Sequence, residues 1–384
     1  MTTDNRQTLL AAVCDFGWGS LGKFRLILDK LPATDVILYG DASINSITTD
    51  LLRSRHRFLH RPPAESNVAL VINDPAAANR IADLGIPVVY VDSLPYLWTT
   101  AEEIPERHKI AYYCAQKFPS DRLSVSGPLR HWHEIHWIDP IVPTPTCRRG
   151  GHGVVINVGG LHSHLVGDTV DAYLGLVLIP LVKELKSLGR TVSAVCGNLP
   201  AETCRQLGEM LPDCRAIGRQ SPYDFEDLLK GADLLITSPG STTILQALAL
   251  GLSTMLLLPQ NLSQYLNMHL FASPGAPTMA WPASVVAPER IEQLRLDGED
   301  AVLTYFYRAI CDAAASPLAA AEVTEIVRAG LCTMPEAGVL DPSMVTLGGN
   351  GAEQVARLIK QAMLAPTRRR ETASRHGEPA PADD

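Results

Sequence analysis

The sequence predicts an α/β fold of two Rossmann-like domains with parallel sheets that face each other across a cleft. Short apolar runs alternate with helical segments in both halves of the chain, which is typical of a parallel sheet covered on both faces. A proline-rich stretch at 140–145, followed by R-R-G-G-H-G at 148–153, divides the halves. A length of 384 residues suits two domains of about 150–200 residues.

The predicted domains are 1–145 and 146–365, and the final helices of the second domain are candidates to return to the first. Residues 366–384 lack an apolar period and predict a disordered tail. Apolar runs predict strands at 9–14, 35–39, 68–72, 87–91, 154–158, 191–195, 233–237 and 254–258. Helices are predicted at 75–84, at about 169–188 and within 288–365. The helix at 75–84 has Asp74 as its N-cap, Pro75 at its first position and Gly85 at its end.

Charge and cysteine usage exclude several classes of protein. The sequence has 33 basic residues (Lys and Arg) and 41 acidic residues (Asp and Glu), so its net charge is −8. A negative charge disfavours binding to nucleic acids or anionic membranes. The sequence has no apolar run of about 18 residues, so no spanning helix and no stable membrane association are expected. Its eight cysteines form no C-x-x-C pair and are typical of free thiols in a reducing compartment. A cytoplasmic protein is therefore expected.

Three clusters of small residues follow predicted strands: G-W-G-S-L-G-K at 17–23, V-G-G-L-H-S-H at 158–164 and T-S-P-G-S-T-T-I-L-Q-A at 237–247. In the third, Ser238, Ser241 and Thr242 offer neutral donors at the start of an apolar helix, where the helix dipole favours an anion. Clusters from both halves that face one cleft indicate a nucleotide diphosphate. Each cluster alone is also compatible with a plain turn or helix cap, and Asp41 lies roughly where an NAD site would need an acid.

These segments resemble glycosyltransferases of the GT-B type, and most closely the peptidoglycan N-acetylglucosaminyltransferase that uses UDP-N-acetylglucosamine. The matches run in order over most of residues 9–270. They are G-S-L-G-K at 19–23 for G-x-x-G-H, P-V-V-Y-V-D-S-L at 87–94 for P-V-V-x-H-E-Q-N, S-G-P-L-R at 126–130 for G-N-P-V-R, G-G-L-H-S at 159–163 for G-G-S-Q-G, and Q-Y-L-N at 264–267 for Q-Q-Y-W-N.

The resemblance implies an inverting transfer from a UDP-sugar, with the acceptor substrate bound by domain 1–145 and the sugar nucleotide bound by domain 146–365. It also implies roles for most of the site residues. Gln246 would reach the ribose, where the family has glutamate, Gln264 the donor sugar, and Arg130 the diphosphate across the cleft, unless Arg130 is a solvated linker residue. The predicted donor-binding residues are Gly19, Gly22, Arg25, Arg130, Gly159, Gly160, His162, Ser163, Ser238, Gly240, Ser241, Thr242, Gln246 and Gln264. The family needs no metal ion, and no cofactor is expected besides the donor. The H-W-H-E-I-H-W run at 131–137 has spacing poorly suited to a metal site.

The predicted catalytic residues are Asp92, Lys23 and Asp15. Lys23 stands where the family has its histidine base, and a lysine is a better anion clamp than a base. Asp92, at a strand end that can face the cleft, is the preferred general base, and Asp15 is the alternative. For both, a capping or turn carboxylate is an equal interpretation.

The acceptor substrate is expected to be small and polar. The alanine-rich stretch at 74–84 does not support a lipid acceptor, and the loop at 15–23 is similar to that of cytosylglucuronic acid synthases, which join cytosine to UDP-glucuronic acid in nucleoside-antibiotic biosynthesis. Lys23 and Arg25 would suit the carboxylate of that donor. A UDP-sugar epimerase or hydrolase and a non-catalytic nucleotide-binding module stay open, as does assembly into a homodimer.

Overall fold

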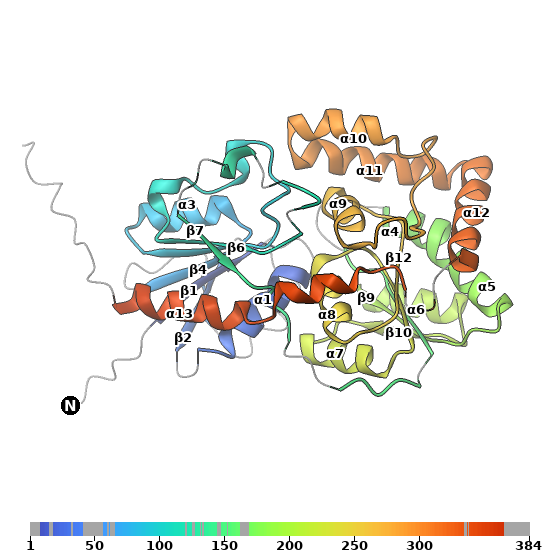
Figure 1. The fold of residues 1–384 in the computed structure, drawn as a ribbon, viewed down its shortest axis with the longest axis horizontal. Helices are drawn as coiled ribbons and strands as arrows, with labels where there is room; N and C mark the ends of the chain where they lie inside the picture. The colour runs from blue at the N-terminus through green and yellow to red at the C-terminus, as the bar shows by residue number, and fades with distance from the viewer. Residues whose placement is uncertain are drawn as a thin grey trace, which may run out of the picture.

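The computed structural model describes residues 8–14, 18–31, 34–40, 57–59, 61, 66–119, 121–124, 127–130, 132, 134–143, 147–151, 153–161, 169–333, 336 and 338–364. These residues form two α/β lobes, each built on a parallel sheet, which confirms the predicted fold class (Figure 1). The N-terminal lobe contains every strand up to β7, and the C-terminal lobe contains the strands from β8 onward. No helix within these ranges is long and apolar enough to cross a membrane.

The N-terminal lobe has a seven-stranded sheet in the order β3-β2-β1-β4-β5-β6-β7, with every neighbouring pair parallel. Its strands are β1 (Thr8–Val13), β2 (Asp35–Tyr39), β3 (Arg57–Leu59), β4 (Val68–Ile72), β5 (Val88–Asp92), β6 (Tyr112–Gln116) and β7 (Ile135–Ile138). The strands predicted from apolar runs are confirmed. Those that were missed are short or carry polar and aromatic residues, and β7 is the edge strand formed by the end of the 131–137 segment.

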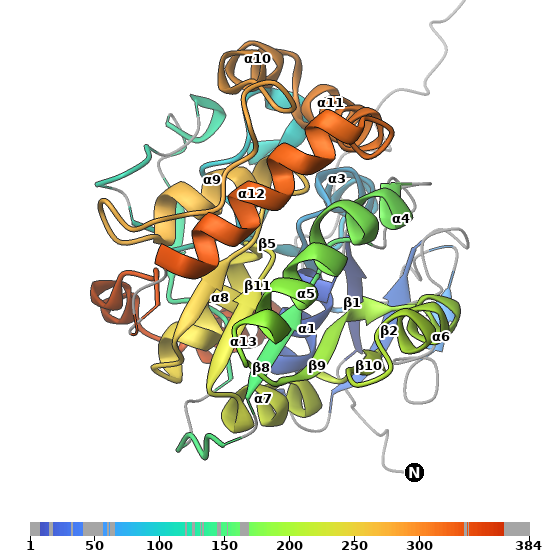
Figure 2. The ribbon, with the colours of Figure 1, turned by 90° about the vertical axis from the view of Figure 1, so that its right-hand side faces the viewer.

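The C-terminal lobe has a five-stranded parallel sheet in the order β10-β9-β8-β11-β12. Its strands are β8 (Val154–Asn157), β9 (Val192–Leu199), β10 (Arg215–Gly218), β11 (Leu234–Thr237) and β12 (Thr254–Leu256). Its helices are α4 (Thr169–Tyr173), α5 (Ile179–Ser187), α6 (Ala201–Met210), α7 (Pro222–Gly231), α8 (Ser241–Ala249), α9 (Leu262–Phe271), α10 (Pro288–Leu294), α11 (Glu299–Ala314) and α12 (Pro317–Thr333). A single π-helical stretch joins α4 to α5, and α12 packs against α5 (Figure 2).

Within the described residues before β8, the N-terminal lobe has the helices α1 (Trp18–Leu28) and α3 (Pro75–Asp83), and local chemistry explains α3. The Asp74 carboxylate accepts a hydrogen bond from Ala77 N at 2.8 Å, and Pro75 occupies the first turn, where its missing N–H costs nothing. Gly85, with a φ of 79°, follows the end of α3. The predicted boundaries and cap of this helix are confirmed.

The last helix, α13 (Gly351–Leu364), packs on the N-terminal lobe, against α1 and strands β4 to β7 (Figure 1). Its buried face carries Val355, Ala356, Ile359 and Ala362 at helical spacing. Gly351 lies so close to the chain at Asp139 that a Cβ would stand 2.0 Å from the Asp139 carbonyl oxygen. The chain therefore crosses between the lobes a second time, and a glycine makes the crossing sterically feasible.

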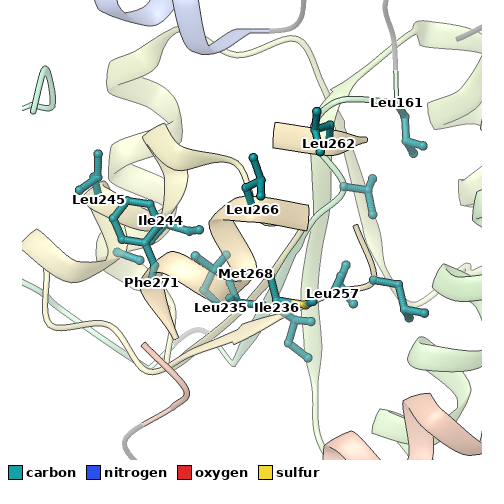
Figure 3. Close-up of a cluster of buried hydrophobic side chains, with 14 of the residues drawn as sticks. Leu161, Leu235, Ile236, Ile244, Leu245, Leu257, Leu262, Leu266, Met268 and Phe271 are labelled. Atoms are coloured by element: carbon teal, nitrogen blue, oxygen red, sulfur yellow. The ribbon is translucent and has the colours of Figure 1, made fainter. Parts of the chain in front are cut away.

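Buried apolar side chains beneath α8 and α9 hold these helices against the sheet. Figure 3 shows Ile244 and Leu245 of α8 beside Leu266 and Phe271 of α9, above Leu235 and Ile236 of β11. All of these residues are buried, so α8 is fixed in place by its apolar face. The N-terminus of α8 is thereby held at the carboxyl end of β11.

In both sheets the direction of chain progression reverses once, between β1 and β4 in one lobe and between β8 and β11 in the other. At such a switch point the loops that follow two adjacent strands diverge and leave a crevice, which is the usual ligand site of open α/β sheets. The loops concerned begin after Val13, Ile72, Asn157 and Thr237.

Candidate active site

A cavity of about 550 Å³ lies between the lobes and is lined by segments that follow these four strands. Residues after β1, β4 and β5 form its wall on the N-terminal lobe. Residues after β8 and β11, together with α9 and the start of α11, form the opposite wall. Most of the predicted site residues line it: Gly19, Gly22, Lys23, Gly159, Gly160, Ser238, Gly240, Ser241, Thr242, Gln246 and Gln264.

Lys23 connects the two walls. Its side chain is only 1% exposed, and its Nζ donates a hydrogen bond of 2.6 Å to Thr242 Oγ1 in the opposite lobe. Burial lowers the pKa of Lys23 from 10.5 to about 8. Among the described residues, no carboxylate forms an ion pair with it. A buried ammonium group therefore faces the cavity with a neutral hydroxyl as its partner.

The helix start at Thr242 adds positive potential of its own. Ser241, Thr242 and Thr243 form the first turn of α8 and line the cavity, and no side chain caps this end, where Gly240 is the N-cap residue. The first backbone N–H groups of a helix have no partner inside the helix and carry the positive end of its dipole. The ammonium group and the helix N-terminus thus converge on one place, which suits an anion with several oxygens.

Gln246 and Gln264 have different environments. Gln246 is 5% exposed and lines the cavity, and its amide has no hydrogen-bond partner in the described part of the chain. The Gln264 amide is already engaged, because Nε2 donates to Gly159 O and Oε1 accepts from Gln260 N. Gln264 therefore holds the loop at Gly160, where φ is 99° and a Cβ would lie 2.6 Å from Gln264 Nε2.

The prediction that Asp92 faces the cleft as a general base is wrong. Asp92 is 0% exposed and does not line the cavity. Its Oδ1 accepts from Leu94 N at 2.8 Å, and its Oδ2 accepts from Trp98 Nε1 at 2.9 Å and Tyr113 OH at 2.6 Å. Burial raises the pKa of Asp92, and these hydrogen bonds partly oppose the rise. The carboxylate fixes neighbouring side chains and cannot reach a substrate.

Two predicted arginine contacts are also corrected. Arg25 lies outside the cavity wall, and its guanidinium pairs with Asp29 at 3.1 Å, one turn along the same helix face. Arg130 is exposed and does not line the cavity, so the solvated alternative holds in this structure. Asp15, His162 and Ser163 lie outside the described residues.

A polar network that was not predicted lies on the wall of the N-terminal lobe. Asn73 adopts a φ of 52°, which is uncommon for a residue with a side chain. Its Nδ2 donates to Ser20 Oγ at 3.1 Å and Ser93 Oγ at 2.8 Å, and its Oδ1 accepts from Ser93 N. Asn73 directly follows the predicted strand at 68–72, and Ser93 lies two residues after the predicted strand at 87–91. These positions at strand ends are the signal that could have identified them.

A pair of carboxylates at the rim of the cavity was missed as well. Glu103 accepts from the backbone N–H groups of Thr99 and Thr100 and, across the lobes, from Glu299 N at 2.9 Å. Burial opposes ionisation of Glu103, but these N–H groups outweigh it and lower its pKa. Burial and the charges of Glu103 and Asp300 raise the pKa of Glu299 to about 7. The two acids come from segments far apart in the sequence, so no local motif marks them.

Within the described ranges, no three His, Cys, Asp or Glu side chains cluster closely enough to hold a metal ion. Of the histidines in the 131–137 segment, His136 lies on β7, where its ring packs against Tyr112. His131 and His133 lie outside the described residues.

Comparison with known proteins gives a family and similar folds. The family model described as CGA synthase-related protein matches residues 48–292. Among solved structures, the chain is similar to the spinosyn rhamnosyltransferase SpnG, with a TM-score of 0.50 and 13% identity over 86% of this chain and 98% of that one. It also resembles MurG of Acinetobacter baumannii, with a TM-score of 0.48 and 13% identity over 93% of this chain and 99% of that one. A search of curated proteins gives no match.

Asp92→Asn tests the structural role of this carboxylate. We expect a lower melting temperature, equivalent to about 1–3 kcal/mol, because a neutral amide accepts less strongly than a carboxylate and its Nδ2 would have to face a donor. Affinity for UDP, measured by calorimetry, should stay within about twofold of the wild-type value. A variant with normal stability and much lower turnover would instead restore Asp92 as a catalytic group.

Proposed function

The chain belongs to the CGA synthase-related protein family and has the two-lobed GT-B fold, and from this premise we propose that it transfers a sugar from a UDP-sugar to a small polar acceptor substrate. The observation that carries the proposal is the buried Lys23 ammonium group facing the uncapped N-terminus of α8. Two positive groups that converge in a cavity favour an anion, and a nucleotide diphosphate has the charge and the number of oxygens to bind both.

In this arrangement the diphosphate lies between Lys23 and the first turn of α8. As the bond from the sugar to the diphosphate breaks, negative charge builds up on the leaving UDP. Lys23 and the helix N–H groups stabilise that charge without moving, because packing already fixes both. Lys23 then acts as an electrostatic catalyst. Lys23 does not act as the general base, because a pKa of about 8 leaves its amine mostly protonated near neutral pH.

Gln246 is the proposed ribose contact. Its amide is almost fully buried, lines the cavity and has no partner within the described residues, so it can donate to and accept from a diol. The contact is neutral and therefore weaker than one from a carboxylate.

The finer assignment concerns the substrates. We propose UDP-glucuronic acid as the donor and cytosine or a nucleoside as the acceptor substrate, as in the cytosylglucuronic acid synthases that the loop at 15–23 resembles. Because Arg25 pairs with Asp29 and Lys23 is assigned to the diphosphate, neither side chain remains as a clamp for the donor carboxylate. With Asp92 enclosed, Asp15 stays the predicted general base.

A turnover panel separates transfer from the other functions open to this fold. The protein is incubated with UDP-glucuronic acid, UDP-glucose or UDP-N-acetylglucosamine, with and without cytosine, and released UDP is measured. We expect release that depends on the acceptor substrate. Free sugar or an epimerised nucleotide without cytosine would mean a hydrolase or epimerase, and UDP binding without turnover would mean a binding module.

Lys23→Met tests the diphosphate site directly. We expect UDP affinity to fall about 10- to 100-fold, because a hydrogen bond to a charged group contributes about 1.5–3 kcal/mol. The melting temperature without ligand should rise, since an apolar chain of similar length replaces a buried charge. The control is Lys30→Met, which removes a surface lysine paired with Glu353 and should change neither quantity by much. Equal UDP affinity for wild type and Lys23→Met would exclude the proposed position of the diphosphate beside Lys23.

The pKa of Lys23 also predicts how binding depends on pH. The bound diphosphate stabilises the ammonium form, so the protein must take up a proton to bind UDP wherever Lys23 is neutral. Affinity should therefore be constant below about pH 8 and fall above it, by about tenfold per pH unit at most. Lys23→Met should lack this decline. Calorimetric titrations from pH 6.5 to 9.5 provide the measurement.

A further inference from the structure

We propose that Ser20, Asn73 and Ser93, together with Trp98, form the subsite that binds the acceptor substrate, as a flat ring whose edge presents hydrogen-bond-accepting atoms. The inference rests on the proposed function, since it assumes that the C-terminal lobe holds the donor. It identifies residues of the N-terminal lobe that would select the acceptor substrate.

The serine hydroxyls carry the first part of the argument. Ser20 and Ser93 line the cavity and are 5% and 3% exposed. Both oxygens accept from the same Asn73 amide nitrogen, so their O–H protons remain to be donated elsewhere. No residue in the described part of the chain accepts either proton. Buried donors normally have a partner, and both serines line the cavity, so a ligand bound there can accept their protons.

Asn73 makes this pair rigid. Its side-chain amide uses both donor hydrogens on the two serines and its oxygen on Ser93 N, which leaves it no freedom to rotate. Its backbone is held at a φ of 52°, a conformation that costs energy and persists only where the surroundings enforce it. The two hydroxyls are thus preorganised on either side of one nitrogen, which lowers the entropic cost of binding a ligand.

Trp98 supplies an aromatic side chain to the cavity wall. It lines the cavity at 8% exposure, and its indole Nε1 donates to Asp92 Oδ2, which fixes the ring plane. Tyr113 donates to the same carboxylate oxygen from the neighbouring strand β6. A fixed aromatic ring favours planar, partly apolar ligands, and any nucleobase can stack on such a ring.

The location agrees with transfer. Ser20 lies on α1, three residues before Lys23, so the two side chains share one face of the helix. Asn73 follows β4 at the switch point of the N-terminal sheet, opposite the N-terminus of α8. Ser20 also follows Gly19, where a Cβ would stand 3.4 Å from Thr242 Oγ1, so a ring held by the serines would lie near the start of α8, where a sugar joined to the diphosphate can reach it.

The experiment measures binding of cytosine and uracil to UDP-saturated protein by calorimetry, for wild type, Ser20→Ala and Ser93→Ala. Cytosine has two neighbouring accepting atoms, whereas uracil carries an N–H in the middle of that edge. We expect wild type to prefer cytosine by about tenfold. Each alanine variant should bind cytosine about 3- to 10-fold more weakly, since one neutral hydrogen bond contributes about 0.5–1.5 kcal/mol.

Ser193→Ala is the matched control, because it removes a half-buried hydroxyl that donates to Val154 O and does not line the cavity. It should leave cytosine affinity unchanged, and melting temperatures confirm that all variants fold. The subsite is disproved if wild type binds uracil as tightly as cytosine or binds neither, or if the alanine variants bind cytosine normally. UDP affinity, titrated separately in every variant, should stay within about twofold, so failure of the subsite is distinguishable from failure of the proposed function.

Discussion

The arrangement of the cleft depends on one unfavourable contact, a buried lysine ammonium group set against the positive end of a helix. Lys23 comes from α1 of one lobe and Thr242 from α8 of the other, and their hydrogen bond joins the two switch points. Neither charge nor dipole finds compensation among the described residues, and burial shifts the pKa of the lysine accordingly. Burial of this ammonium group costs free energy, and an anion bound beside it, as we propose, would offset that cost.

Much of this site could be predicted because strands, turns and helix starts are local in sequence. The cluster from Ser238 to Gln246 follows an apolar strand and opens an apolar helix, so its position at a sheet edge could be inferred without coordinates. The contact of Glu103 with Glu299 N could not, because it joins residues 196 positions apart. The strands β6 and β7 were not predicted for a different reason, which is that aromatic and polar residues interrupt their apolar pattern.

Asp92 shows why residue type and position do not define a role. An aspartate at the carboxyl end of a central strand suggests a base, yet its environment decides what it does. Tyr113 and Trp98 donate to one of its oxygens and the Leu94 backbone to the other, so the carboxylate acts as an internal brace. The aromatic partners come from β6 and from the loop after β5, and neither was expected to turn toward it. The acid thereby supports the wall that substrate would touch, while remaining out of reach itself.

The return of α13 to the first lobe has a consequence for biosynthesis. A ribosome makes the N-terminal lobe first, yet the helix that covers α1 and strands β4 to β7 is encoded after the whole C-terminal lobe. Until Gly351–Leu364 emerges, the apolar residues beneath that helix stay exposed on the nascent chain, which makes them a target for chaperones. Completion of the first lobe is thus coupled to completion of the polypeptide, and a chain that stops before Gly351 leaves that lobe without its covering helix.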